Sequence, residues 1–262
     1  MQTILITGGT GMVGQSLTNL LLNKGYQVIV LTRQQKQSSR TNFSFAQWDL
    51  NKAWIDPAAI AAADYIIHLA GEGVADKRWT AKRKKAILDS RVQSSALLVK
   101  ALKENPNKVK AIVAASAIGW YGPDNEKSIA SGFVETDPVD ASFLGDTCKQ
   151  WEESMHPVKA LGIRLVSIRI GIVFNKMGGA LAEFMKPAKL GAAAILGDGK
   201  QIVSWIHQQD LNRLILFALE QEQMTGVYNA VAPDPVRNSI LTKAIAQRYH
   251  TWAIPFHVPS FI

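Results

Sequence analysis

The sequence predicts an α/β protein with a doubly wound parallel sheet, in which helices cover both faces of the strands. Short apolar segments rich in β-branched residues alternate with amphipathic segments over the first 171 residues, which is the pattern of strand–helix–strand crossovers. The first apolar segment begins at Thr3 and runs into a glycine-rich turn and then a helical segment. The chain has 262 residues, 47% of them hydrophobic and 19% charged. That length and composition allow one sizeable core.

The remaining elements follow in order along the chain. A helix is expected from Gln15 to Lys24, directly after the glycine-rich turn. Further strands are expected at 27–31, 43–48, 65–69, 111–115 and 164–170, and further helices at 58–63, 81–103 and 143–159. The nearly continuous apolar character of 27–31 and 65–69 is typical of strands buried on both faces.

Beyond Gly171 the sequence changes character. The stretches 178–179 and 190–201 are rich in glycine and alanine, with short apolar elements between them. We therefore expect a Rossmann-type domain over residues 1–171 and a smaller substrate lobe over 172–262, placed above the carboxyl ends of the strands, where open α/β sheets bind ligands. A helix at 209–220 and a strand at 226–230 are expected to return to the main sheet.

Three glycines spaced three apart, Gly8, Gly11 and Gly14, join the first strand to the first helix. The first allows a sharp turn, the second lets a pyrophosphate approach the backbone, and the third lets helix and strand pack closely. Glycine-rich turns occur in many loops, but a strand before and a helix after this one favour a dinucleotide site.

The end of the second strand indicates which dinucleotide is bound. A carboxylate there would bind the ribose diol of NAD, but this chain has Thr32 and Arg33, with Lys36 and Arg40 nearby. A guanidinium group matches a 2′-phosphate, so NADP is the expected cofactor. The alternative is that Arg33 is an ordinary surface residue.

Composition excludes several function classes. No apolar run is long enough for a membrane span, and a strand starting at Thr3 leaves no room for a signal peptide. A single cysteine, Cys148, fits a reducing cytoplasm. The net charge is +8, with one dense basic cluster from Lys77 to Lys85. We interpret this cluster as a solvated helix face rather than a grip for nucleic acid or a phosphorylated substrate.

Several further segments carry a family resemblance. They are Thr-Gly-Gly-Thr-Gly-Met-Val-Gly at 7–14, His-Leu-Ala-Gly-Glu at 68–72, Asp-Lys-Arg-Trp at 76–79, Asp-Ser-Arg at 89–91, Ser-Ala-Ile-Gly-Trp-Tyr-Gly at 116–122, Ser-Trp-Ile-His at 204–207 and the run 229–238. Together they resemble the atypical extended short-chain dehydrogenase/reductases known as epimerase-family or NAD-dependent epimerase/dehydratase-like proteins, including the bacterial YfcH type. Members usually continue some tens of residues past the position of Ile262, which implies a naturally short or a truncated chain.

The resemblance implies roles for individual residues. Arg33 would meet the 2′-phosphate, and Ser116 would lie beside the nicotinamide and polarise the reacting oxygen. The pyrophosphate would be held by Gly8, Thr10, Gly11, Met12, Val13 and Gly14, the adenine by Asp49 and Leu50, and the groove towards the nicotinamide would be lined by Leu69, Ala70 and Gly71.

The chain departs from the usual chemistry of that superfamily, in which a tyrosine and a lysine one helical turn apart exchange a proton during hydride transfer. In the helix 143–159 these two positions hold Leu144 and Cys148, and Lys149 points about 100° away. Tyr121 could donate the proton or could be a packing aromatic, and Cys148 could be reactive or buried and inert. Alternatively the chain binds NADP without rapid turnover.

The substrate side is also altered. The positions of an asparagine and an arginine used by sugar-nucleotide enzymes hold Ile172 and Val203, which argues against a UDP-sugar unless Arg78, Lys200 or Arg237 supplies another clamp. The expected partner is a small carbonyl or hydroxyl compound of unknown identity, with no membrane partner. A homo-oligomer is compatible with the sequence. His207 and Asp210 lack further ligands at suitable spacing, so we expect no metal.

Overall fold

The structure is a computed structural model that describes residues 1–74, 77–175 and 178–256. Two compact units are formed by discontinuous parts of the chain. The first contains Met1–Gly122, Glu135–Arg169 and Asn212–Asn229, and the second contains Pro123–Val134, Ile170–Leu211 and Ala230–Ile262. The last six residues, 257–262, where the sequence suggests a short or truncated chain, lie outside the described residues.

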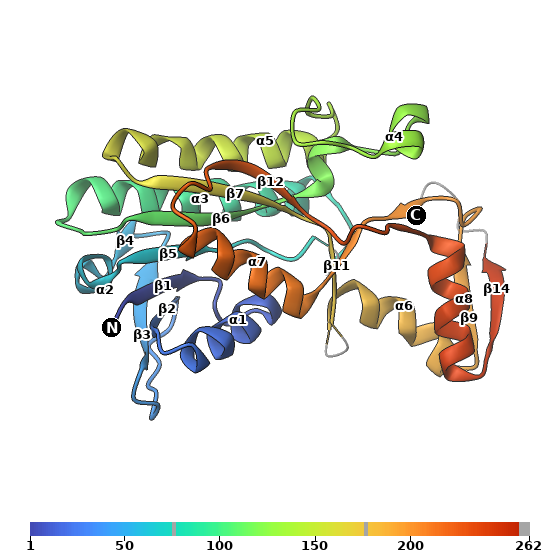
Figure 1. Ribbon diagram of the computed structural model, residues 1–262, viewed down its shortest axis with the longest axis horizontal. Coiled ribbons are helices and arrows are strands. Elements are labelled where there is room, and N and C mark those ends of the chain that lie inside the picture. The colour runs from blue at the N-terminus through green and yellow to red at the C-terminus, as the bar shows by residue number, and fades with distance from the viewer. Residues whose placement is uncertain (75–76, 176–177, 257–262) are drawn as a thin grey trace. The chain divides into compact units, whose positions relative to one another are not determined.

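The first unit is built on a mostly parallel sheet with the strand order β12-β7-β6-β5-β1-β2-β3-β4 (Figure 1). The strands are β1 (Thr3–Thr7), β2 (Gln27–Thr32), β3 (Phe43–Asp49), β4 (Trp54–Ile55), β5 (Tyr65–His68), β6 (Ala111–Ala117), β7 (Arg164–Ile170) and β12 (Gly226–Ala230). The antiparallel β3–β4 pair lies at one edge. This Rossmann-type sheet confirms the predicted fold class.

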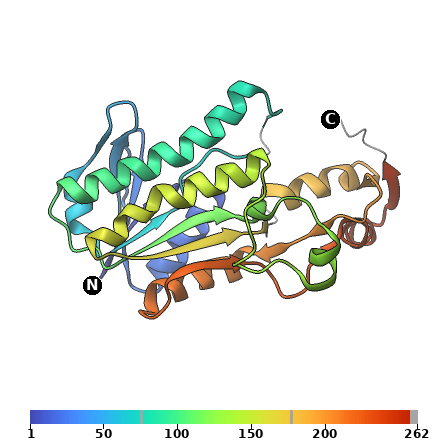
Figure 2. The ribbon, with the colours of Figure 1, turned by 90° about the horizontal axis from the view of Figure 1, so that it is seen from above.

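Helices cover both faces of this sheet (Figures 1 and 2). On one face lie α3 (Ala81–Glu104) and α5 (Phe143–Met155), and on the other lie α1 (Met12–Asn23) and α7 (Gln208–Glu220). The short helix α2 (Pro57–Ala62) follows β4, and the 3-10 turns η1 (Ile118–Tyr121) and η2 (His156–Leu161) follow β6 and α5. The helix expected at 143–159 therefore ends earlier, at Met155, because Pro157 lacks the amide that would continue it.

The central strand β1 is buried on both faces, and Ile4, Leu5 and Ile6 have no solvent-exposed surface. It lies between β2 and β5, and the strand order reverses at this point, since β2 and β3 follow on one side and β5 and β6 on the other. In doubly wound sheets the crevice at such a reversal, outside the carboxyl ends of the strands, is where ligands bind.

The second unit contains small sheets and short helices. Strand β8 (Ile172–Phe174) pairs with β11 (Trp205–His207), β9 (Ala192–Leu196) with β14 (Trp252–Phe256), and β10 (Ile202–Val203) with β13 (Val236–Arg237). Its helices are α4 (Glu126–Ser131), α6 (Gly179–Lys189) and α8 (Asn238–Tyr249).

The unit boundaries differ from those expected at segment 123–134 and, by two residues, at 170–171, which belong to the second unit. Segment 123–134, placed by sequence in the first domain, belongs to the second unit, where the Asp124 carboxylate accepts a hydrogen bond from the Ile202 amide at 3.0 Å. The first unit includes Asn212–Asn229, which carries the helix and strand expected to return to the sheet. Within the described parts of the chain, no helix has the length and apolar character needed to cross a bilayer.

Candidate functional site

Of the three spaced glycines between β1 and α1, two are closely packed and one is open. Gly8 has φ +69°, and a Cβ there would meet the Leu69 carbonyl oxygen at 2.6 Å. A Cβ at Gly14 would lie 2.4 Å from the Gly8 oxygen. At Gly11 an added Cβ would approach only the Gly8 oxygen, at 3.3 Å, among the described residues. The turn therefore leaves its outer side at Gly11 open to a ligand.

The first turn of α1 faces this opening with free donors. The amides of a first helical turn have no carbonyl four residues back, and the helix dipole makes this end positive. The N-cap is Gly11, no side chain of the described residues caps the turn, and the first turn contains no acidic residue. Thr10 is exposed, and Met12 and Val13 are half-buried. This backbone fits a pyrophosphate group.

Arg33 follows β2 on the same edge of the sheet, and its side chain is exposed. Neighbouring cations have contacts: Arg40 donates to the Asn19 amide oxygen at 3.0 Å, and the Lys36 ammonium lies 5.9 Å from the Phe45 ring centroid. The guanidinium of Arg33, by contrast, makes no hydrogen bond or ion pair with another residue of the described ranges. It is thus an open cation next to the glycine turn.

The two residues that are expected to contact the adenine lie where β3 ends. Asp49 is the last residue of this strand, and Leu50 follows it. The Asp49 carboxylate accepts hydrogen bonds from the amides of Asn51, at 2.9 Å, and Lys52, at 3.2 Å. Leu50 packs against the core of the unit. These contacts fix the turn after β3, where both side chains remain half-buried.

The loop after β5 is fixed to β1 by a buried polar chain. The Thr7 hydroxyl accepts the amides of Leu69, at 3.1 Å, and Ala70, at 3.2 Å, so it donates to His68 Nδ1 at 2.8 Å. Nε2–H of His68 then donates to Ser95 Oγ at 3.0 Å. Complete burial lowers the pKa of His68 from 6.5 to about 4, so the ring is neutral. Sequence reasoning noted His68 only as part of a motif.

Ser116, near the end of β6, belongs to a buried ionic cluster with Glu152 and Arg169. Its hydroxyl donates to Glu152 Oε1 at 2.6 Å, and Arg169 Nε donates to the same oxygen at 2.9 Å. Arg169 Nη2 reaches Glu152 Oε2 at 3.1 Å. The three residues are 2–6% exposed. The Ser116 hydroxyl thus donates its hydrogen bond to Glu152 rather than into the crevice. Sequence reasoning did not assign Glu152 and Arg169, since a helix and a strand reveal no pairing by themselves.

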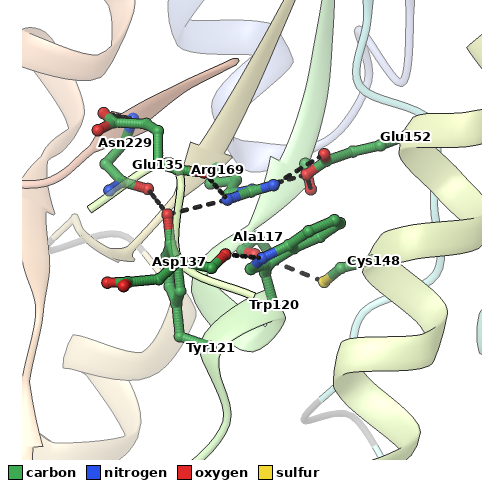
Figure 3. Close-up of polar contacts among 10 residues, drawn as sticks. Ala117, Trp120, Tyr121, Glu135, Asp137, Cys148, Glu152, Arg169 and Asn229 are labelled. Carbon is green, nitrogen blue, oxygen red and sulfur yellow. Dashed lines mark hydrogen bonds and ion pairs between the residues drawn. The ribbon is translucent and has the colours of Figure 1, made fainter. Parts of the chain in front are cut away.

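Tyr121, at the end of η1, is also engaged. Its hydroxyl donates to Asn229 Oδ1 at 2.7 Å and accepts from Arg169 Nη1 at 3.0 Å. The side chain is 7% exposed, and burial raises the pKa of the phenol despite the nearby Arg169. The Arg169 guanidinium stacks on Trp120, 3.7 Å from the ring centroid (Figure 3). These contacts hold the phenol in a packed position.

Leu144 and Cys148, which the resemblance aligns with the missing tyrosine and lysine, lie on α5 beside the turn after β6. A Cβ on Gly119 would be 3.2 Å from Leu144 Cβ and 3.6 Å from Cys148 Sγ, so both residues face the turn after β6. The Cys148 thiol points to the Ala117 carbonyl oxygen at 3.5 Å. Burial, with the Glu152 charge, raises the pKa of Cys148 to about 11, so the thiol is protonated. Lys149 is exposed.

The basic cluster at the start of α3 is partly paired. Arg83 forms an ion pair with Glu72, and Lys85 Nζ lies 2.5 Å from the Asp89 carboxylate. Arg78 is exposed.

The candidate substrate residues of the second unit lie on its small strands. Ile172 pairs with Trp205, and Val203 pairs with Val236. The Lys200 ammonium lies 3.7 Å from Asp198. Within the described ranges no group of three His, Cys, Asp or Glu side chains is arranged to hold a metal.

The glycine turn at the strand-order reversal of a mostly parallel sheet defines a Rossmann-type α/β protein. More specifically, the chain belongs to the NAD dependent epimerase/dehydratase family, whose sequence model matches residues 4–230.

Relatives and solved structures agree with this membership. An epimerase family protein of Staphylococcus haemolyticus is 35% identical over 266 residues, which cover 100% of this chain and 85% of the relative. Epimerase family protein YfhF of Bacillus subtilis is 34% identical, over 94% of this chain and 80% of the relative. The structure of human epimerase family protein SDR39U1 (isoform 2) with NADPH has a TM-score of 0.83 at 27% identity, covering 98% of this chain and 83% of that chain. MoeE5 in complex with UDP-glucuronic acid and NAD, at 20% identity and a TM-score of 0.81, covers 98% of this chain and 85% of that chain and shares the fold.

Proposed function

We propose that this chain is an NADP(H)-binding protein of the extended short-chain dehydrogenase/reductase type. The observation that carries the proposal is the open guanidinium of Arg33 at the end of β2, where an NAD-specific site would carry a carboxylate. A 2′-phosphate is a dianionic group that a guanidinium binds through two parallel hydrogen bonds. The human relative, whose structure was solved with NADPH, supports the same cofactor.

The other proposed contacts use backbone and packing. Gly8, Thr10, Gly11, Met12, Val13 and Gly14 would hold the pyrophosphate, Asp49 and Leu50 the adenine, and Leu69, Ala70 and Gly71 the groove beyond it. The open space at Gly11 and the uncapped α1 terminus fit this group.

The test is a comparison of NADPH and NADH affinities by fluorescence or calorimetric titration. Arg33→Asp should weaken NADPH binding about 100-fold, because it replaces an attraction with a repulsion, and should change NADH binding little. Lys24→Asp makes the same change of charge at the opposite end of α1 and should leave both affinities unchanged. Equal affinities of the wild-type chain for NADPH and NADH would refute the NADP preference.

Two activities are compatible with such binding. The first is an oxidoreductase or epimerase-like reaction on a small carbonyl or hydroxyl compound. The bound cofactor would supply or accept a hydride, and the protein would have to move a proton. Ser116 and Tyr121 are the proposed groups for polarising the oxygen and donating the proton, and each would first have to exchange its present partner for substrate.

The second candidate is a protein that binds NADP(H) and responds to its redox state with little turnover. The apolar pair Leu144 and Cys148 favours it, because neither side chain can exchange a proton near neutral pH. Incubating the chain and NADPH with a panel of small aldehydes and ketones separates the two. Tight binding without NADPH consumption above a protein-free blank supports the second, and consumption lost on Tyr121→Phe supports the first.

A further inference from the structure

Arg91, on α3, is a half-buried cation next to the loop that follows β5. Its Nη1 donates to the Ile87 carbonyl oxygen at 2.9 Å, and its guanidinium carbon lies 4.8 Å from the Trp151 ring centroid on α5. A Cβ built on Gly71 would lie 3.1 Å from the same carbon. The guanidinium therefore fills the space between α5 and the backbone after β5.

The charge of Arg91 is not balanced by an ion pair with any described residue. Glu72, a carboxylate whose charge acts on Arg91, is paired with Arg83 instead. Burial lowers the pKa of Arg91 but leaves it a cation. Its nitrogens other than Nη1 make no hydrogen bond within the described ranges and still reach solvent. A cation that loses water on one side and keeps open donors on the other is typical of a binding site.

The position of Arg91 relates it to the missing lysine. Cys148, which occupies the lysine position on α5, is close enough to Arg91 for each charge to affect the pKa of the other group. Gly71 follows β5 and Arg33 follows β2, on opposite sides of β1. A dinucleotide whose 2′-phosphate meets Arg33 therefore extends its nicotinamide half towards Gly71 and Arg91.

We propose that Arg91 is a cofactor-binding residue that replaces the missing lysine, with its open N–H groups hydrogen-bonding the hydroxyls of the nicotinamide ribose. The inference rests on the proposed NADP(H) binding and adds a specific contact to it. The replacement keeps the positive charge of a lysine but not its chemistry, because a guanidinium does not give up its proton near neutral pH.

Three probes that differ only beyond the adenosine end test this contact. They are NADP⁺, 2′-phospho-ADP-ribose, which lacks the nicotinamide, and 2′-phospho-ADP, which lacks the second ribose as well. Dissociation constants are measured by calorimetry for the wild-type chain, Arg91→Met and Lys85→Met. Lys85 is an exposed lysine on the same helix and controls for the lost charge.

Arg91→Met should weaken binding of NADP⁺ and of 2′-phospho-ADP-ribose by roughly 10- to 100-fold, the loss expected for charge-assisted hydrogen bonds. It should leave 2′-phospho-ADP binding unchanged, and Lys85→Met should leave all three unchanged. Equal weakening of all three probes by Arg91→Met would mean a structural role and would overturn the inference, as would no change in any of them.

The outcomes also separate this inference from the proposed function. If the wild-type chain binds none of the probes, NADP(H) binding fails and the inference fails with it. If it binds all three and Arg91→Met has no effect, the inference alone fails. Should Arg91→Met not fold, Arg91→Lys takes its place, since it keeps the charge and the aliphatic stem. We expect that variant to bind the two probes that carry the second ribose severalfold more weakly, and unchanged dissociation constants for these two probes would overturn the inference.

Discussion

The two halves of the carboxyl edge of the main sheet differ in how their polar groups are used. In the half formed by β1, β2 and β3, the first-turn amides of α1 and the guanidinium of Arg33 are open. We call this the open half. In the half formed by β6, β7 and α5, which we call the saturated half, Ser116, Tyr121 and Glu152 form hydrogen bonds with partners inside the unit. Binding of a nucleotide needs backbone shape and one cation, whereas proton transfer needs a titratable group with a free position. Nucleotide binding and proton transfer therefore depend on different residues of the chain.

The largest expected effect comes from removing the Glu152 carboxylate, which lies at the centre of the saturated half. Glu152→Ala leaves Arg169 as an unpaired buried cation and should reduce the free energy of unfolding by about 3–5 kcal/mol. Chemical denaturation measures this free energy of unfolding. The double variant Glu152→Ala/Arg169→Met removes both charges and should recover part of the loss. A single variant as stable as the wild-type chain would show that the cluster is not a structural unit.

The next test compares two glycines of the open half. Gly14→Ala forces a methyl group against the Gly8 oxygen and should cost about 3 kcal/mol of stability, with binding lost as well. Gly11→Ala brings its methyl group to 3.3 Å from the Gly8 oxygen, a tight contact with one atom among the described residues, and should lower the stability much less than Gly14→Ala does. It should nevertheless bind NADPH at least tenfold more weakly, because the methyl group occupies the phosphate approach. Equal affinities of Gly11→Ala and the wild-type chain would contradict the assignment of the opening.

A third test concerns His68, at the border between the halves. Its folded-state pKa of about 4 lies below the ordinary value of 6.5, so the unfolded chain binds the extra proton between these values. Stability should therefore fall as the pH falls through this window, by about 2 kcal/mol between pH 7 and pH 5. His68→Gln should flatten this part of the pH profile of unfolding. His207→Gln, a change at an exposed histidine, serves as the control and should leave the profile unchanged.

The smallest expected effect distinguishes a packed phenol from one that contacts the cofactor. Tyr121→Phe deprives Asn229 and Arg169 of one hydrogen-bond partner and should cost about 1 kcal/mol of stability. NADPH affinity, measured by titration, should stay within a factor of two, since the phenol is bonded inside the unit. A large loss of affinity with unchanged stability would place the hydroxyl at the ligand instead.

The strand, the glycine turn and the helix of the open half are predictable from the sequence because their signals are local. A strand, three spaced glycines and a helix occur within the first 24 residues, and Arg33 directly follows the next strand. The sheet follows from the alternation of buried apolar strands with helices. Even the absence of the tyrosine–lysine pair is visible at Leu144 and Cys148.

The saturated half could not be predicted in the same way. Tyr121 and Asn229 are 108 residues apart, and Ser116 and Glu152 are 36 apart. Each residue type is visible in the sequence, but its partner depends on the sheet order and on which helix packs beside it. The same holds for Arg91, whose surroundings come from Gly71 and Trp151 on two other segments. The place of segment 123–134 depends in the same way on a contact between distant residues, because Asp124 and Ile202 are 78 residues apart.

The position of β12 at the edge of the main sheet has a consequence for biosynthesis. This edge strand is made only after the ribosome has completed the long excursion through the second unit. Until then β7 presents unpaired amides and carbonyls along its outer side, a template for association with other chains. A fragment that ends at residue 171 would lack β12 and would leave the outer side of β7 unpaired. Cleavage of the chain at one position therefore cannot release a complete first unit.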